Sequence, residues 1–121
     1  MDQKRILIVE DESIIALEMK TRLEKLGYQV ADMAMAGERA IELVEQLAPD
    51  LVLMDIMLKG KMDGIEAARR ITARRAIPVI FLTAHADEQT LQRAKVSGPF
   101  GYLVKPFQMR DLHITIEMAL Y

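Results

Sequence analysis

The chain has 121 residues and a net charge of −2, from 16 Lys and Arg against 18 Asp and Glu. This length suits one domain that buries its own core. The lack of cysteine excludes a disulfide framework, a thiolate zinc site and a cysteine nucleophile. The charge balance gives no positive excess for nucleic acid or an anionic membrane, and no apolar run approaches a membrane span. These features predict a small soluble domain, for which a cytoplasmic location is expected.

The first half of the chain predicts two strands and two helices before a third strand. After the run Arg5–Glu10, apolar residues recur at helical spacing up to Gly27, where a helix C-cap belongs: Ile15, Met19, Leu23 and Leu26. The mixed run Gln29–Ala34 suits an edge strand, and the next helical stripe ends before Pro49: Ile41, Val44 and Leu47. Leu51–Met54 is apolar throughout, as is typical of a strand buried on both faces.

The second half continues the alternation. Strands are predicted at Pro78–Leu82 and Gly101–Val104, and the helical stripes around them are Ile65, Ala68 and Ile71, then the weaker Leu91 and Ala94, then Leu112, Ile116 and Leu120. Five strands alternating with five helices predict an α/β fold with a doubly wound parallel sheet covered on both faces. The last predicted helix runs to Tyr121 without a stop signal. This leaves open that the single domain, residues 1–121, is excised from a longer multidomain protein.

Polar residues gather where the predicted strands end, which is where doubly wound sheets bind ligands. They are Glu10, Asp11 and Glu12, then Asp55, then Thr83, then Lys105 and Pro106. Crowded carboxylates repel one another unless a cation joins them, and Mg²⁺ is the hard cation that fits best, with Mn²⁺ as the alternative. A metal, an ammonium and a hydroxyl together suit a phosphoryl group. A central Asp can then be the nucleophile that forms an aspartyl phosphate.

At these residues the chain resembles the response-regulator receiver domains of two-component signalling. The motifs that carry the resemblance are Ile6-Leu7-Ile8-Val9-Glu10-Asp11, Leu53-Met54-Asp55, Phe81-Leu82-Thr83-Ala84 and Gly101-Tyr102-Leu103-Val104-Lys105-Pro106-Phe107. Each motif is short, but their order, spacing and placement at strand ends are specific. The resemblance implies a flavodoxin-like (βα)5 fold with strand order 2-1-3-4-5. It also implies that a histidine kinase or histidine phosphotransfer protein donates a phosphoryl group to Asp55.

The resemblance implies a role for each residue of the site. Asp11, Asp55 and the backbone carbonyl of Met57 would bind Mg²⁺, and Glu10 would bind it through water. Thr83, the amide of Ala84 and Lys105 would contact the phosphoryl oxygens, with a cis bond before Pro106. Thr83 and Tyr102 would form the switch.

The expected output is protein–protein contact. The resemblance implies that the switch changes the face formed by the fourth helix, fifth strand and fifth helix, which would contact a downstream protein or a linked output domain. Homodimerisation through this face is a further option. We expect this domain to bind neither nucleic acid nor membrane.

Two departures from the family pattern follow Asp55. Lys59 stands where the family usually has proline, and the spacing from Asp55 to Asp63-Gly64 is one residue longer than usual. This loop would lie beside the phosphorylation site, so phosphate loss and the fit to a kinase would depend on it.

Other interpretations apply to single residues. Asp11 alone could cap the first helix, Asp55 could be a turn residue, and His85 is expected to be a solvated loop residue. A haloacid-dehalogenase-type phosphatase needs a second Asp where Met57 stands, and a flavodoxin-like carrier would have its flavin phosphate repelled by Glu10-Asp11-Glu12. We therefore expect no turnover of a separate substrate, only self-catalysed phosphorylation and dephosphorylation. The alternative that stays open is a pseudo-receiver that only binds proteins.

Overall fold

The computed structural model describes residues 3–84 and 87–121. The strands are β1 (Arg5–Val9), β2 (Gln29–Ala34), β3 (Leu51–Asp55), β4 (Val79–Thr83) and β5 (Gly101–Val104). The helices are α1 (Ser13–Lys25), α2 (Gly37–Leu47), α3 (Gly64–Arg74), α4 (Glu88–Val96) and α5 (Met109–Leu120). Strand and helix alternate along the chain, as the spacing of apolar residues predicts.

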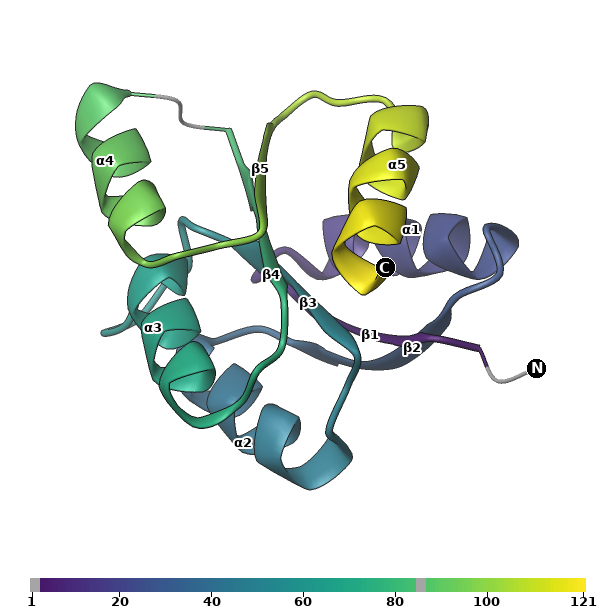
Figure 1. Cartoon of the computed structure of the whole chain (residues 1–121), viewed down its shortest axis with the longest axis horizontal. Coiled ribbons are helices and arrows are strands. Elements are labelled where there is room, and N and C mark those ends of the chain that lie inside the picture. The colour runs from purple at the N-terminus through teal and green to yellow at the C-terminus, as the bar shows by residue number, and fades with distance from the viewer. Residues whose placement is uncertain (1–2, 85–86) are drawn as a thin grey trace.

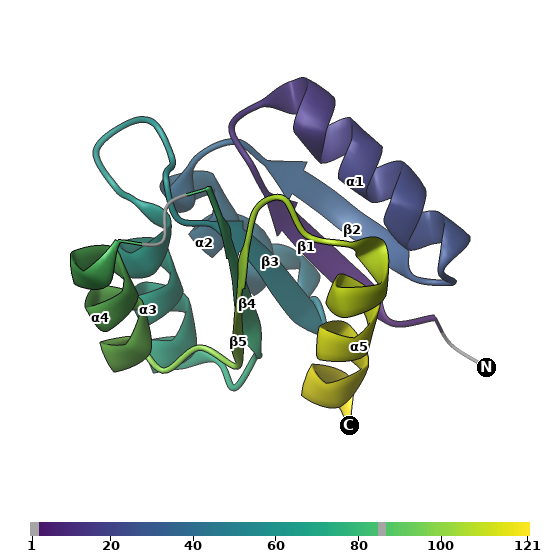
Figure 2. The same ribbon diagram turned by 90° about the horizontal axis from the view of Figure 1, so that it is seen from above.

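The strands form one parallel sheet in the order β2-β1-β3-β4-β5. Helices α1 and α5 cover one face, and α2, α3 and α4 cover the other (Figures 1 and 2). The doubly wound α/β fold and its strand order are therefore confirmed. None of the helices in the described part of the chain combines the length and the hydropathy needed to cross a membrane.

Alternation along the central strands divides the core into two layers. In β3, Leu51 and Leu53 pack beneath α1 and α5, whereas Val52 and Met54 pack beneath α2 and α3. All five residues of β3 are buried, which confirms that the wholly apolar run is a central strand. Because successive side chains point to opposite faces, a run without polar residues is what two covered faces require.

Strand β2 is an edge strand, as its mixed sequence predicts, and its first residue is exposed. Its register with β1 shifts between Ile6 and Leu7, where the partners change from Val30 to Asp32. Such a bulge shortens the regular pairing available to an edge.

The limits of the strands matter for the site. Strand β1 ends at Val9, one residue before the predicted limit, so Glu10 lies just beyond the sheet. Strand β3 extends one residue further than predicted and ends on Asp55, and β4 begins and ends one residue later than predicted, at Val79 and Thr83. The polar residues therefore lie at, or directly after, the carboxyl ends of these strands.

Candidate functional site

The site lies where the winding of the sheet reverses, at the carboxyl ends of β1 and β3. Chain segments leave these neighbouring strands toward opposite faces, which opens a crevice between them. Glu10 is 5% exposed and Asp55 is 7% exposed. Two nearly buried carboxyl groups in a small core call for positive charge and hydrogen-bond donors around them.

Asp11 completes a group of three carboxylates. One carboxylate oxygen from each of Glu10, Asp11 and Asp55 lies within 4.8 Å of the other two. Each carboxylate also accepts a hydrogen bond from a backbone amide: Glu12 N–H to Glu10 (3.1 Å), Met57 N–H to Asp55 (3.1 Å) and Lys59 N–H to Asp11 (3.1 Å). An all-oxygen set of this kind is the chemistry that Mg²⁺ and Mn²⁺ prefer.

Asp11 does not serve as a helix cap. The N-cap position of α1 belongs to Glu12, and no side-chain hydrogen bond closes that end of the helix. The carboxylate of Asp11 instead accepts the amide of Lys59, which is 48 positions away in the sequence. The capping interpretation of Asp11 is therefore wrong.

Lys105 brings the positive charge. Its ammonium nitrogen lies 3.0 Å from Glu10 Oε1 and 3.4 Å from Asp55 Oδ2. The backbone of Lys105 is fixed as well, because its N–H donates to the carbonyl of Thr83 at 2.7 Å. The peptide bond between Lys105 and Pro106 is cis, the geometry that the receiver resemblance leads one to expect.

Burial and charge act in opposite directions on these groups. Burial raises the pKa of Glu10, and the nearby Asp55 charge adds to the rise, although the hydrogen bonds from Lys105 and Glu12 oppose it. Burial alone would lower the pKa of Lys105, but the hydrogen bond to Glu10 and the charge of Asp55 outweigh it and raise the pKa. Lys105 is therefore held as an ammonium by the carboxylates that it bridges.

Thr83, Ala84 and Tyr102 lie along the neighbouring strands. Thr83 is fully buried at the end of β4, and Ala84 follows it at an exposed position. Tyr102 lies on β5, where it pairs with Phe81 and packs against the core on the α2–α4 face. Burial raises the pKa of the Tyr102 hydroxyl, and the charge of Asp87 adds to this effect.

A close backbone approach sits beneath Asp55. A methyl group built on Gly64, the first residue of α3, would lie 2.1 Å from the carbonyl oxygen of Asp55. The Gly64 amide donates to the carbonyl of Ile56 at 2.9 Å. Gly64 is therefore required by the short distance between α3 and the end of β3, and this contact positions the backbone of Asp55.

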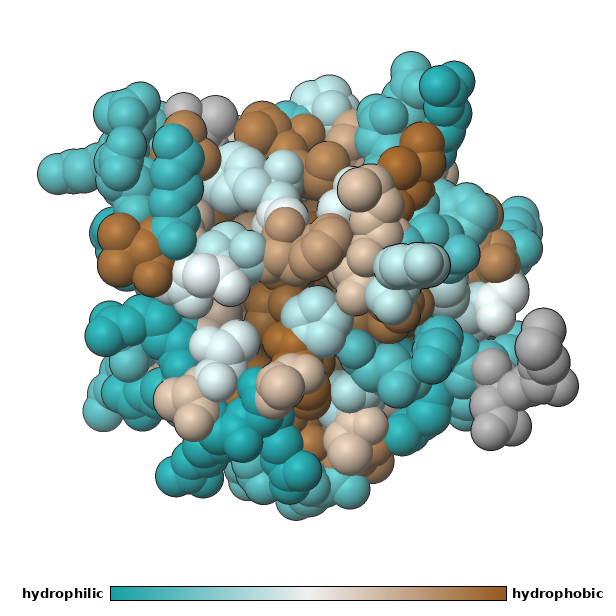
Figure 3. Space-filling view, viewed as in Figure 1, coloured by the Kyte–Doolittle hydropathy of each residue, from teal (hydrophilic) through white to brown (hydrophobic). Residues whose placement is uncertain are grey.

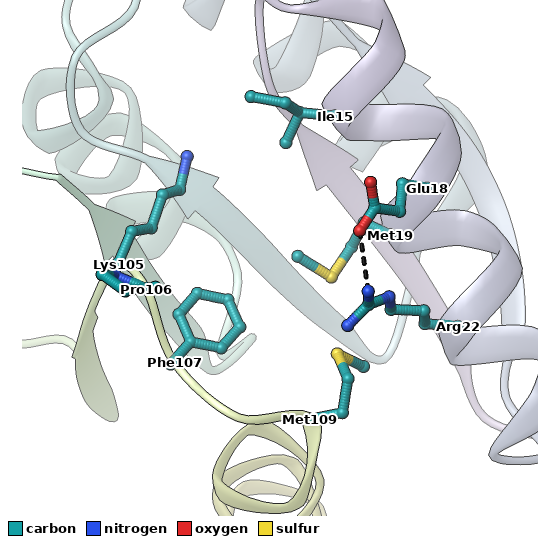
Figure 4. A pocket seen from close by; sticks show the side chains of 8 residues that line it. All are labelled: Ile15, Glu18, Met19, Arg22, Lys105, Pro106, Phe107 and Met109. Carbon is teal, nitrogen blue, oxygen red and sulfur yellow. Dashed lines mark ion pairs between the residues drawn. The ribbon is translucent and has the colours of Figure 1, made fainter.

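A pocket of about 260 Å³ adjoins Lys105 on the side of α1 and α5. Its walls are largely apolar, apart from an ion pair between Glu18 and Arg22 at 2.9 Å (Figure 4). The Lys105 side chain extends away from Met109, so its ammonium faces the carboxylates rather than this pocket (Figure 4).

The structure brings most of the predicted site residues together at the carboxyl ends of the strands. Glu10, Asp11, Asp55 and Lys105 are joined by the contacts given above, and Met57 contributes its amide to Asp55. His85 lies outside the described residues. Sequence reasoning missed the amide of Lys59, because a backbone donor has no residue signature. It also missed the contact of Gly64, although the Asp63-Gly64 pair had marked the end of the loop.

Comparison with known proteins gives consistent matches. The response regulator receiver domain family matches residues 6–117. The transcriptional regulatory protein PdtaR of Mycobacterium tuberculosis is 40% identical over 117 residues, which cover 97% of this chain and 57% of that protein. The positive alginate biosynthesis regulatory protein of Pseudomonas aeruginosa is 42% identical, over 94% of this chain and 46% of that protein. The chain spans about half the length of these curated relatives.

Solved structures agree with the family and the fold. The signal receiver domain of a modulated diguanylate cyclase from Desulfovibrio desulfuricans has a TM-score of 0.92 and 45% identity to this chain. The match covers 98% of this chain and 94% of the diguanylate cyclase chain. A CheY-like receiver domain protein from Methanospirillum hungatei has a TM-score of 0.91 and 31% identity, with the same coverage. The predicted resemblance is therefore confirmed: the chain belongs to the response-regulator receiver domains of two-component systems.

Proposed function

We propose that the domain is a phosphorylation-dependent switch that accepts a phosphoryl group on Asp55. The donor would be a phosphohistidine of a histidine kinase or phosphotransfer protein in the cytoplasm. The observation that carries this proposal is the buried carboxylate of Asp55, which lies between two further carboxylates and the ammonium of Lys105. A carboxylate in such a position can act as a nucleophile while its neighbours control the charge.

The chemistry is a transfer between two nucleophiles. A carboxylate oxygen of Asp55 forms the new O–P bond as the N–P bond of the phosphohistidine breaks, and the bonding pair stays on the imidazole nitrogen. Lys105, already 3.4 Å from Asp55, would neutralise one phosphoryl oxygen. The Thr83 hydroxyl and the Ala84 amide would donate hydrogen bonds to others.

The cluster of three carboxylates fits a divalent cation, because one oxygen from each of them lies within 4.8 Å of the other two and oxygen is the ligand atom that such cations prefer. Asp11, Asp55 and the Met57 carbonyl would hold Mg²⁺ directly, and Glu10 would hold it through water. The bound cation supplies positive charge that lowers the electrostatic cost of a phosphoryl group near three carboxylates. Apart from its own phosphorylation and dephosphorylation, the domain would turn over no substrate.

The output surface would be the face formed by α4, β5 and α5. Apolar side chains gather over the middle of this face (Figure 3). Large apolar side chains that are exposed on these elements or directly before β5 include Val96 (84%), Phe100 (47%), Val104 (40%), Ile114 (48%) and Met118 (63%). Thr83 and Tyr102 lie on the strands beneath it. Movement of Thr83 toward the phosphoryl group, followed by Tyr102, would bias two conformations of this face and so change its affinity for a partner or a second copy.

Intact-protein mass spectrometry after incubation with a small acyl phosphate tests the proposal. Wild type should gain one phosphoryl group in a Mg²⁺-dependent manner, and Asp55→Asn should gain none because the nucleophile is absent. Asp111→Asn, the same change at an exposed position on α5, is the matched control and should be labelled like wild type. Equal labelling of Asp55→Asn would overturn the assignment. No labelling from either the acyl phosphate or a phosphorylated phosphotransfer domain would favour the pseudo-receiver that only binds proteins.

A further inference from the structure

The connection between β3 and α3 is anchored at two points on the side of the core. Leu58 and Met62 are each 8% exposed and belong to the core beneath α2 and α3. The Met62 sulfur packs so closely on Gly37 that a methyl group there would lie 3.1 Å from it. Between these anchors Lys59, Gly60 and Lys61 are exposed, and Gly60 has a φ of +101° that favours glycine. The tip of the connection is therefore held in a defined position beside the carboxylates.

This tip reaches the site through a backbone group. The amide of Lys59 donates to Asp11 Oδ2 at 3.1 Å. Glu10 and Asp55 receive their amides from residues two positions further along the chain, whereas Asp11 receives its amide from a separate loop. Receiver domains usually have proline at the position of Lys59, and proline has no N–H to donate. The contact thus depends on the residue type by which this chain departs from its family.

One carboxylate can accept a hydrogen bond from a backbone amide and bind a cation at the same time. An ionised carboxylate has two oxygens with about four acceptor sites, so the Lys59 N–H leaves positions on Asp11 for a metal. Asp11 is partly exposed, and a partly exposed side chain samples several rotamers unless a contact selects one. A charge-assisted hydrogen bond from a fixed loop selects one before the metal arrives.

We propose that the backbone amide of Lys59 is a positioning group for Asp11, which orients this carboxylate toward Glu10 and Asp55 for a divalent cation. The inference rests on the proposed function, in which Asp11 binds Mg²⁺. The side chain of Lys59 has no part in it. The β3–α3 loop is in this way part of the metal site, although it provides no carboxylate to it.

The test compares Lys59→Pro, which removes the N–H, with Lys59→Ala, which keeps it and removes the charged side chain. Mg²⁺ binding is measured by isothermal titration calorimetry. Lys59→Pro should bind roughly 3- to 10-fold more weakly than wild type, as expected for the loss of one hydrogen bond, and Lys59→Ala within about twofold of it. Equal affinities of Lys59→Pro and Lys59→Ala would overturn the inference.

A second measurement needs no change in the loop. In the metal-free protein, Asp11→Ala should shift the Lys59 amide resonance in ¹⁵N spectra and accelerate its hydrogen exchange several-fold, because the acceptor is gone. Asp111→Ala should do neither. An unmoved Lys59 resonance in Asp11→Ala would overturn the inference even if Lys59→Pro fails to fold.

The two proposals fail in different ways. If wild type binds no Mg²⁺, the proposed function and the metal-directed role of Lys59 are both overturned. If wild type binds Mg²⁺ and is phosphorylated, but the Lys59 amide does not respond to Asp11→Ala, the role of Lys59 alone is overturned.

Discussion

The two ends of the sheet place charged groups on the same backbone framework in different ways. At the amino ends of the strands, Asp50 accepts the Arg5 amide at 2.8 Å, and the Arg5 guanidinium donates to the Leu47 carbonyl at 2.6 Å. Opposite charges are present there and both are held by the backbone. At the carboxyl ends, three carboxylates lie together and the ammonium of Lys105 contacts two of them, Glu10 and Asp55. The charged groups at the amino ends satisfy backbone donors and acceptors of the fold. The groups at the carboxyl ends leave an excess of negative charge, which a bound cation would neutralise.

The largest expected effect on stability comes from adding a methyl group at Gly64, next to the backbone of Asp55. Gly64→Ala should destabilise the protein by about 3 kcal/mol or more, because its methyl group would overlap the Asp55 carbonyl and force the backbone to move. Gly60→Ala is the matched control. It meets nothing within 4 Å, so only its positive φ costs energy, about 1–2 kcal/mol. Urea unfolding measures both, and a Gly64→Ala loss no greater than that of Gly60→Ala would contradict the close approach.

The next effect is the response of the carboxyl end to a cation. The proposed function has Mg²⁺ binding to the folded site alone, so Mg²⁺ should raise the free energy of unfolding by about 2.7 kcal/mol at a hundredfold excess over its dissociation constant. Asp11→Ala should lose most of this gain, while Asp111→Ala should keep it. Thermal unfolding with and without Mg²⁺ provides the measurement. A full gain in Asp11→Ala would place the cation elsewhere.

The smallest effect belongs to the amino end. Asp50→Ala removes the acceptor of the Arg5 amide and should cost about 1 kcal/mol. Asp50→Asn keeps an acceptor oxygen and should cost less. Neither variant should alter the gain in stability from Mg²⁺, which urea unfolding in both buffers would check. A changed Mg²⁺ response in Asp50→Ala would mean that the two ends are coupled.

Much of the fold could be predicted from the sequence, because a strand that is buried on both faces has an unbroken run of apolar residues. Such a run predicted the central strand β3, and the polar residues after it predicted the position of the candidate site. Helix α4 left a fainter pattern, since Ala94 is its fully buried residue. The ends of β3 and β4 lie one residue beyond the predicted limits because Asp55 and Thr83 keep their ladder pairing with the neighbouring strands, although both are polar.

The details of the site were harder to predict, because they depend on distances between backbones. Nothing in the residue type of Lys59 shows that its amide meets Asp11, since the contact depends on the conformation of a loop. Asp63 is similar: it caps α3 through the Glu66 amide and also pairs with Arg93 on α4 at 2.8 Å. A capping role follows from sequence position, but a partner 30 residues away on another helix does not.

The two buried anchors of the β3–α3 connection have a consequence for how the chain tolerates insertion. Because Leu58 and Met62 fix the ends of the exposed tip, a residue added or removed between them leaves these two anchors and the core around them in place. For a flexible segment the entropy of closure changes by only about a few tenths of a kcal/mol, far below the cost of disturbing β3 or α3. Such a change does move the Lys59 amide that contacts Asp11, so the length of this tip is expected to alter the orientation of one carboxylate while the fold keeps its stability.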